Sequence, residues 1–91
     1  MDISTALGLI KARLGIRSDA RDAYILSIAE GAIKELKESQ GLEMDTDNPS
    51  HLMFIVDYTA WRYSNRDEPN GMPRHLQWRL HNLIIGGAKN E

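Results

Sequence analysis

The feature that most constrains this fold is one predicted helix, over residues 49–64, that is apolar on two sides. Asn48 can cap it and Pro49 suits its first turn, whereas the Asn, Pro and Gly residues of 65–73 end it. At about 100° per residue, two apolar sets fall on nearly opposite sides: Leu52, Val56, Thr59, Ala60 and Tyr63 on one, and Phe54, Tyr58 and Trp61 on the other. Such a helix either lies at the centre of a bundle or packs one side against another chain.

Three further helices are predicted around it, over residues 2–14, 19–40 and 73–85. Each carries apolar residues at three- to four-residue spacing, and Ser18-Asp19 and Pro73 are typical helix starts. Gly15, Gly41 and the pair Gly86-Gly87 are placed to end helices. We expect Leu42 or Met44 to hold the following loop against the core. The sequence therefore predicts one all-α domain over residues 1–91, a bundle of about four helices with the third helix central.

Composition limits what this chain can be. Its 91 residues, 42% apolar and 26% charged, fit one soluble domain. There is no cysteine, no basic-then-apolar leader, and no apolar run near the roughly 20 residues that span a bilayer. We therefore expect a cytoplasmic origin and no membrane partner.

Charge is distributed unevenly along the chain. Residues 42–73 carry a net charge of -4, whereas residues 74–91 carry +2. Tight duplex binding needs a concentrated basic face, which the dispersed basic residues do not supply. The acidic middle and basic end could meet across copies of the protein, or could simply be a solvated surface.

No pattern for catalysis, a cofactor or a metal is present. The serines lie at caps or on polar faces, and Gly86-Gly87 follows a helix instead of preceding one, unlike a phosphate-binding loop. His75 and His81 are six residues apart, not the four that suit metal ligands on one helix. The acids of 43–47 lack the spacing of a calcium loop. For Asp57 we expect pairing with Arg62 or Arg66, or exposure to solvent. We expect no catalytic, cofactor or metal residues.

The last helix carries an apolar pair away from its inner stripe. Trp78 and Ile85 lie on its far side, beside Arg74 and His81. An aromatic residue with arginine is typical of protein interfaces. The alternative is that Trp78 folds back over a helix end of its own chain.

The order of these elements resembles that of phage head-tail connector proteins. In the first half the likeness rests on Leu14-Gly15-Ile16, Asp22-x-x-Ile25, Ala29 and Ala32. In the second half it rests on Ala60-x-x-Tyr63-x-Asn65-Arg66, a loop with Pro and Gly, Pro73 and the series Leu76, Leu80 and Leu83. The acidic loop 41–49 has no counterpart in the family pattern. The likeness covers nearly the whole chain, and its motifs are structural, not catalytic.

The resemblance implies a head-completion, or adaptor, protein in the neck of a tailed phage or prophage. Such a protein forms a ring, typically twelvefold, under the portal protein. The ring extends the DNA channel without sequence-specific DNA binding and presents a surface to the next neck component, a stopper or tail completion protein. Expected partner-binding residues are Phe54, Tyr58, Trp61, Arg74, Trp78 and Ile85; expected structural residues of the 65–73 loop are Tyr63, Asn65, Arg66 and Pro73. The alternative is a small cytoplasmic helical DNA-binding or regulatory domain.

Overall fold

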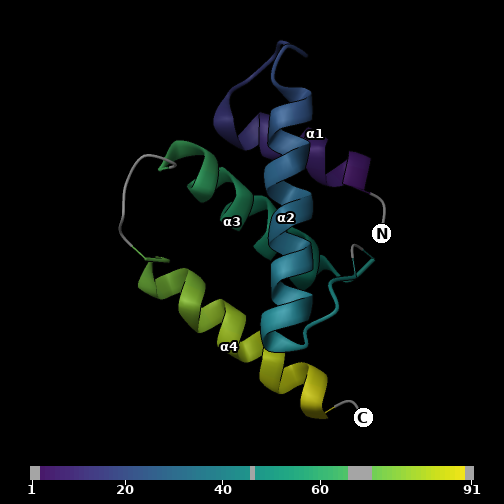
Figure 1. Cartoon of the computed structure of the whole chain (residues 1–91), viewed down its shortest axis with the longest axis vertical. Helices are drawn as coiled ribbons and strands as arrows, with labels where there is room; N and C mark the ends of the chain where they lie inside the picture. Colours follow the sequence, from purple (N-terminus) through teal and green to yellow (C-terminus); the bar gives the residue numbers. More distant parts are fainter. Residues whose placement is uncertain (1–2, 46, 66–70, 90–91) are drawn as a thin grey trace.

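The computed structural model describes residues 3–45, 47–65 and 71–89, and for 87–89 the backbone alone. It contains four helices: α1 (Ile3–Leu14), α2 (Asp22–Gln40), α3 (Pro49–Ser64) and α4 (Arg74–Lys89). The described residues contain no strand, which confirms the all-α prediction. Figure 1 shows α2 along the long axis, with α3 crossing it and α4 running to the lower end of the molecule.

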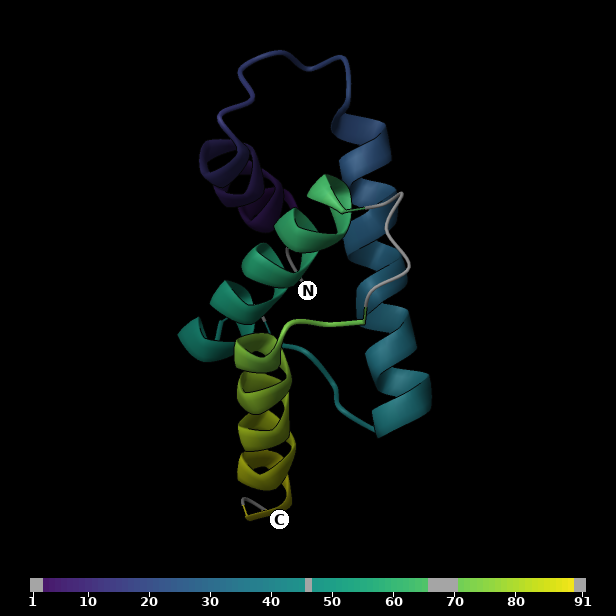
Figure 2. The same cartoon turned by 90° about the vertical axis from the view of Figure 1, so that its left-hand side faces the viewer.

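Helix α3 is the centre of the bundle, as predicted. It packs against α1, α2 and α4, and α1 and α2 also contact each other. Figure 2 shows α3 between α1 and α2, with α4 continuing below them. Both apolar sides of α3 are used, because Phe54 and Ile55 are fully buried and Val56 and Ala60 nearly so. The core is completed by residues of the other elements: Ala6, Ile10, Ile25, Ala29, Ala32, Leu36, Leu42, Met44 and Leu76.

Local signals set most helix ends where we expected them. Asn48 caps α3, since its side-chain oxygen accepts a hydrogen bond of 2.9 Å from the Ser50 amide. Gly15 and Gly41 end α1 and α2 with φ of 73° and 66°, the left-handed conformation that glycine adopts without a steric penalty. The Gly41 amide donates to the Lys37 carbonyl at 3.1 Å.

The predicted start of α2 at Ser18-Asp19 is wrong. The helix begins at Asp22, and Arg21 at the cap position makes no side-chain cap. Asp19 is instead drawn to α1, where its carboxylate lies 2.9 Å from the Lys11 ammonium, as does that of Asp22. The hydrogen bonds that Lys11 donates, first to Asp19 and then to Asp22, raise the pKa of Lys11, and Lys11 lowers the pKa of Asp19. The pair therefore fixes the α1–α2 connection without extending the helix.

The predicted end of α4 is also wrong. The helix continues past Gly86 to Lys89, whereas the sequence placed its end at residue 85. Glycine ends a helix when it adopts positive φ, and among the described residues only Gly15 and Gly41 do so. Gly86 keeps a right-handed backbone, and α4 gains about one further turn.

The acidic loop between α2 and α3 is held at several points. Leu42 and Met44 are both buried, so each anchors the loop to the core as predicted. The Asp45 amide donates to Nδ1 of His51 at 3.0 Å, and the Asp47 amide donates to the Asp45 carboxylate at 2.9 Å. His51 therefore acts as a hydrogen-bond acceptor for the loop.

Thr59 places a hydroxyl inside the core. Its side chain is fully buried, and Oγ1 has no hydrogen-bond partner among the described residues. We expect Thr59→Val to raise the free energy of unfolding by about 1 kcal/mol, because valine keeps the shape and removes an unpaired polar group. Urea unfolding followed by circular dichroism measures the change. A loss of stability would show that the hydroxyl has a partner in solution.

Candidate functional site

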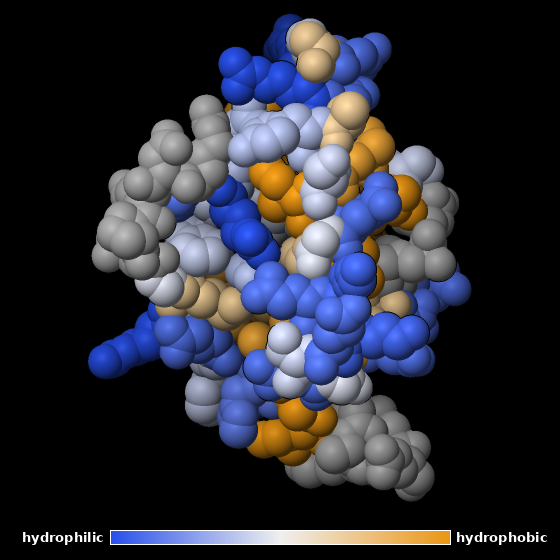
Figure 3. Space-filling model, viewed as in Figure 1, coloured by the Kyte–Doolittle hydropathy of each residue, from blue (hydrophilic) through white to orange (hydrophobic). Residues whose placement is uncertain are grey.

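The outward side of α4 forms a continuous exposed strip. Arg74, Trp78, His81 and Ile85 lie within about 60° of one another around the helix axis, and all four are exposed. Trp78 is 66% exposed and Ile85 37%. Figure 3 shows apolar atoms gathered over the C-terminal part of α4, within a largely polar surface. We call these four residues the α4 strip; its exposure agrees with the first of the two alternatives for Trp78.

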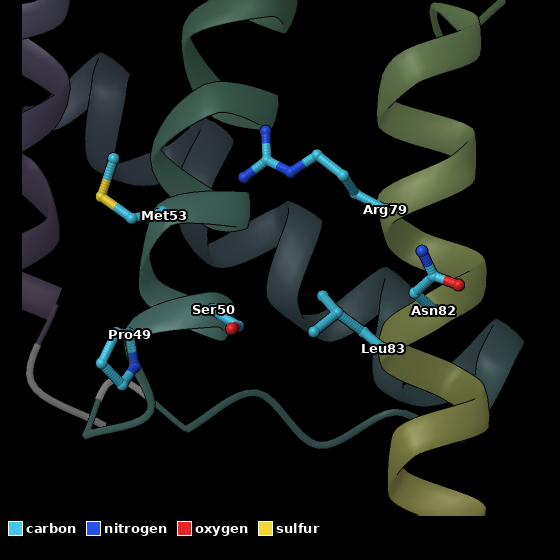
Figure 4. A pocket seen from close by; sticks show the side chains of 6 residues that line it. All are labelled: Pro49, Ser50, Met53, Arg79, Asn82 and Leu83. Atoms are coloured by element: carbon cyan, nitrogen blue, oxygen red, sulfur yellow. The ribbon is translucent and has the colours of Figure 1, made fainter.

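A groove between α3 and α4 runs beside the α4 strip. Its volume is about 460 Å³, and its lining consists of Pro49, Ser50, Met53, Arg79, Asn82 and Leu83. Figure 4 shows Arg79 and Leu83 extending from α4 toward α3. Asn82 follows Trp78 by one helical turn, so the groove and the α4 strip adjoin. Met53, 44% exposed, adds a further accessible apolar side chain.

Asp57 joins three helices beneath this surface. Its two carboxylate oxygens lie 2.9 Å from Nε of Arg13 on α1 and 2.7 Å from the Arg79 guanidinium on α4. The Arg79 guanidinium also lies 5.7 Å from the centre of the Phe54 ring. The expected pairing of Asp57 with Arg62 is wrong, because Arg62 reaches Glu35 on α2 at 3.1 Å. Arg66, the other expected partner, lies outside the described residues.

We expect Asp57→Asn to lower the free energy of unfolding by about 1–2 kcal/mol. The amide is neutral, so two guanidinium groups lose the anion they share in a partly buried place. Thermal unfolding measures the loss. The matched control is Glu35→Gln, which removes the more exposed Arg62 pair and should change stability by less than about 0.5 kcal/mol. Equal effects of the two variants would contradict a special role for Asp57.

The structure corrects the prediction that Phe54 and Tyr58 are available to a partner. Phe54 is fully buried and Tyr58 only 7% exposed, because α3 packs on both sides within its own chain. The two rings stack at 5.7 Å, and Tyr58 and Trp61 stack at 5.8 Å. Trp61 is partly buried against the core. The Phe54–Tyr58–Trp61 side of α3 is therefore mainly interior, and the accessible expected residues are Arg74, Trp78 and Ile85.

The expected structural residues lie at the ends of α3 and α4. The Tyr63 hydroxyl accepts a 2.7 Å hydrogen bond from Arg21, and its ring packs 5.9 Å from Tyr24. The Asn65 side-chain amide donates to the Trp61 carbonyl at 2.9 Å and closes the last turn of α3. The Pro73 carbonyl accepts the first amides of α4, from Leu76 and Gln77. Arg66, expected to hold the 65–73 turn, lies outside the described residues.

Among the described residues, Arg62 is a second cation, besides Lys11, whose pKa is shifted. Its guanidinium lies 5.7 Å from the centre of the Tyr58 ring and donates to Glu35. Burial lowers the pKa of Arg62, but Tyr58 and Glu35 together outweigh it, so the net change is upward. Arg62 therefore stays charged and holds α3 to α2.

Other kinds of site find no support in the part of the chain that the structure describes. No three His, Cys, Asp or Glu side chains there are grouped so that they could hold a metal ion. None of the described helices is long and apolar enough to pass through a membrane. The arrangement is suited to binding a protein surface through the α4 strip and groove.

Comparison of the chain with known protein families, with curated proteins and with solved structures finds no match.

Sequence reasoning missed two parts of this site. The groove depends on how α3 and α4 cross, which residue spacing does not report, so Met53 and Arg79 were not singled out. The sequence drew attention to Asp57 because it is an acid on an aromatic-rich helix. It did not predict the partners of Asp57, which come from helices distant in sequence. Trp78 and Ile85 were found because they lie off the apolar stripe of their own helix.

Proposed function

We propose that this chain is a structural protein of the phage neck. It forms a ring, twelvefold by family likeness, under the portal protein, joins head to tail and extends the DNA channel. It then presents a surface to a stopper or tail completion protein. The virion neck is its place of action, and the cytoplasm of the bacterial host holds it before assembly.

The observation that carries the proposal is the α4 strip. Its own chain leaves Trp78 largely exposed and Ile85 partly exposed, although a tryptophan side chain gains more than most from burial. Tryptophan and arginine are enriched among residues that dominate protein–protein binding. The four-helix order and the segment from Ala60 to Leu83 supply the family likeness, and the α4 strip supplies a surface through which a connector could bind.

Charge indicates how copies could join. Helix α4 contains Arg74, His75, Arg79 and His81 and no acid, whereas the loop before α3 exposes Glu43, Asp45 and Asp47. A ring needs two different complementary surfaces on each subunit, because its contacts are head-to-tail. The basic α4 and the acidic loop are such a pair. Each contact is weak alone, so a portal that holds many subunits together would favour closure of the ring.

The DNA channel places a second demand on the protein. A chain with a net charge of -2 and dispersed basic residues does not offer a concentrated face for phosphates. DNA would pass such a ring without being held tightly. A small DNA-binding domain, the alternative function, would need a concentrated basic face that holds the phosphates.

Negative-stain images of the protein mixed with the portal protein of the same phage test the proposal. We expect an added ring on the portal and no retardation of duplex DNA at about 150 mM salt. Portal particles left unchanged at excess protein would contradict the neck assignment. Retardation of the duplex under those conditions would favour the DNA-binding alternative.

A further inference from the structure

A second, smaller hollow lies where the ends of α1 and α3 meet the first turn of α4. These three helix ends are on the left-hand side in Figure 1. The hollow has a volume of about 280 Å³, and its polar lining consists of Arg13, Asp57, Ser64, Asn65 and His75. Trp61 belongs to its apolar lining. Polar groups from three separate elements therefore surround one small space.

Two cations and one anion form a charged group at the edge of this hollow. Among the lining residues that the structure describes, Asp57 is the one acid. It is shared between Arg13, which lines the hollow, and Arg79, which lies outside the lining. One carboxylate cannot neutralise two guanidinium groups, so these three side chains together keep a net positive charge. His75 adds a ring nitrogen that can donate a hydrogen bond.

Hydrogen-bond donors remain for a ligand. Arg13 uses Nε for Asp57, while its two terminal nitrogens have no partner among the described residues, and its side chain is 56% exposed. The Ser64 hydroxyl and the His75 ring also lack partners within the described part of the chain. The planar fork of an arginine matches two oxygens of a tetrahedral oxyanion, and a hydroxyl and an imidazole donate singly.

We propose that this hollow binds a phosphate group, with Arg13, Ser64 and His75 as its donors. The group would add the anion that Arg13 and Arg79 lack when they share Asp57 alone. It would come from free phosphate or from the backbone of DNA, which offer the same chemistry. This site is separate from the α4 strip and does not depend on the proposed function.

Titration of the isotope-labelled chain with sodium phosphate, followed by amide chemical shifts, tests the site. Sodium chloride of equal ionic strength is the control for general screening. We expect saturable shifts around Ser64, Asn65 and His75, with a dissociation constant in the millimolar range. Arg13→Gln and His75→Gln should each raise that constant about tenfold. The matched variant Arg17→Gln, which removes an exposed arginine outside the hollow, should leave it unchanged.

Three outcomes would overturn the proposal: the same shifts with chloride, equal weakening by Arg13→Gln and Arg17→Gln, or shifts that map away from the hollow. Because Arg13→Gln also removes an Asp57 contact, thermal unfolding of each variant accompanies the titration, and His75→Gln tests the site without touching that contact. A second titration with a short DNA duplex separates the sources. Shifts of the same residues at lower phosphate concentration identify the DNA backbone, and shifts with inorganic phosphate alone identify the free ion.

Discussion

Replacing Phe54 by alanine is expected to lower the free energy of unfolding by about 3–5 kcal/mol. The ring is fully buried in the central helix, stacks on Tyr58 at 5.7 Å and lies under the Arg79 guanidinium. Its removal leaves a cavity in the core beside the α4 residue Arg79, whose guanidinium covers the ring. Because a domain of this size has a stability of about 5–15 kcal/mol, the variant should be partly unfolded near body temperature. Urea unfolding followed by circular dichroism measures the loss.

Met53→Ala is the matched control for this prediction. Met53 is adjacent in sequence but 44% exposed, so its truncation should lower stability by about 1 kcal/mol or less. Similar losses for the two variants would mean that the aromatic side of α3 is not the interior of the chain.

Replacing Trp78 by alanine is expected to abolish assembly while leaving the free chain folded. Trp78 is 66% exposed, so its stability contribution should be within about 0.5 kcal/mol. If the α4 strip forms the contact, the binding free energy of each interface should fall by about 2 kcal/mol or more. This corresponds to a dissociation constant that is roughly thirtyfold higher. A ring repeats that loss at every subunit. Sedimentation of the protein with portal particles measures the bound fraction.

Tyr24→Ala provides the comparison for the assembly experiment. Tyr24 is another exposed aromatic residue, at 45%, but it lies on α2 and outside the α4 strip. Its replacement should leave portal binding unchanged. Loss of binding in both variants, or in neither, would contradict the assignment of the contact to α4.

The sequence predicts the four helices and the central position of α3 because these depend on local chemistry. Asn48 and Pro49 define the start of α3, and Gly15 and Gly41 adopt the positive φ that ends α1 and α2. The prediction was wrong at two helix boundaries, the start of α2 and the end of α4. Tertiary contacts decide the first, and the backbone freedom of glycine decides the second. Lys11 draws Asp19 away from a capping role, and Gly86 remains helical since nothing requires it to turn.

The candidate site was only partly predictable for a related reason. Spacing tells which residues share a side of a helix, as with Phe54, Tyr58 and Trp61, but not what covers that side. Here α3 is enclosed by its own chain, so the first two of these residues are interior. Trp78 could be distinguished from the core residues because few other apolar residues share the outer side of α4. The partners of Asp57 come from α1 and α4, and an ion pair between helices cannot be predicted from the local sequence around either residue.

Acrylamide quenching of single-tryptophan variants tests most directly the claim that α4 keeps an apolar side free for a partner. In the free chain, Trp78 (measured in Trp61→Phe) should be quenched strongly and Trp61 (measured in Trp78→Phe) weakly, in line with their exposure. On addition of portal particles, quenching of Trp78 should fall. A Trp78 that is protected in the free chain, or that stays equally accessible on the portal, would contradict the account.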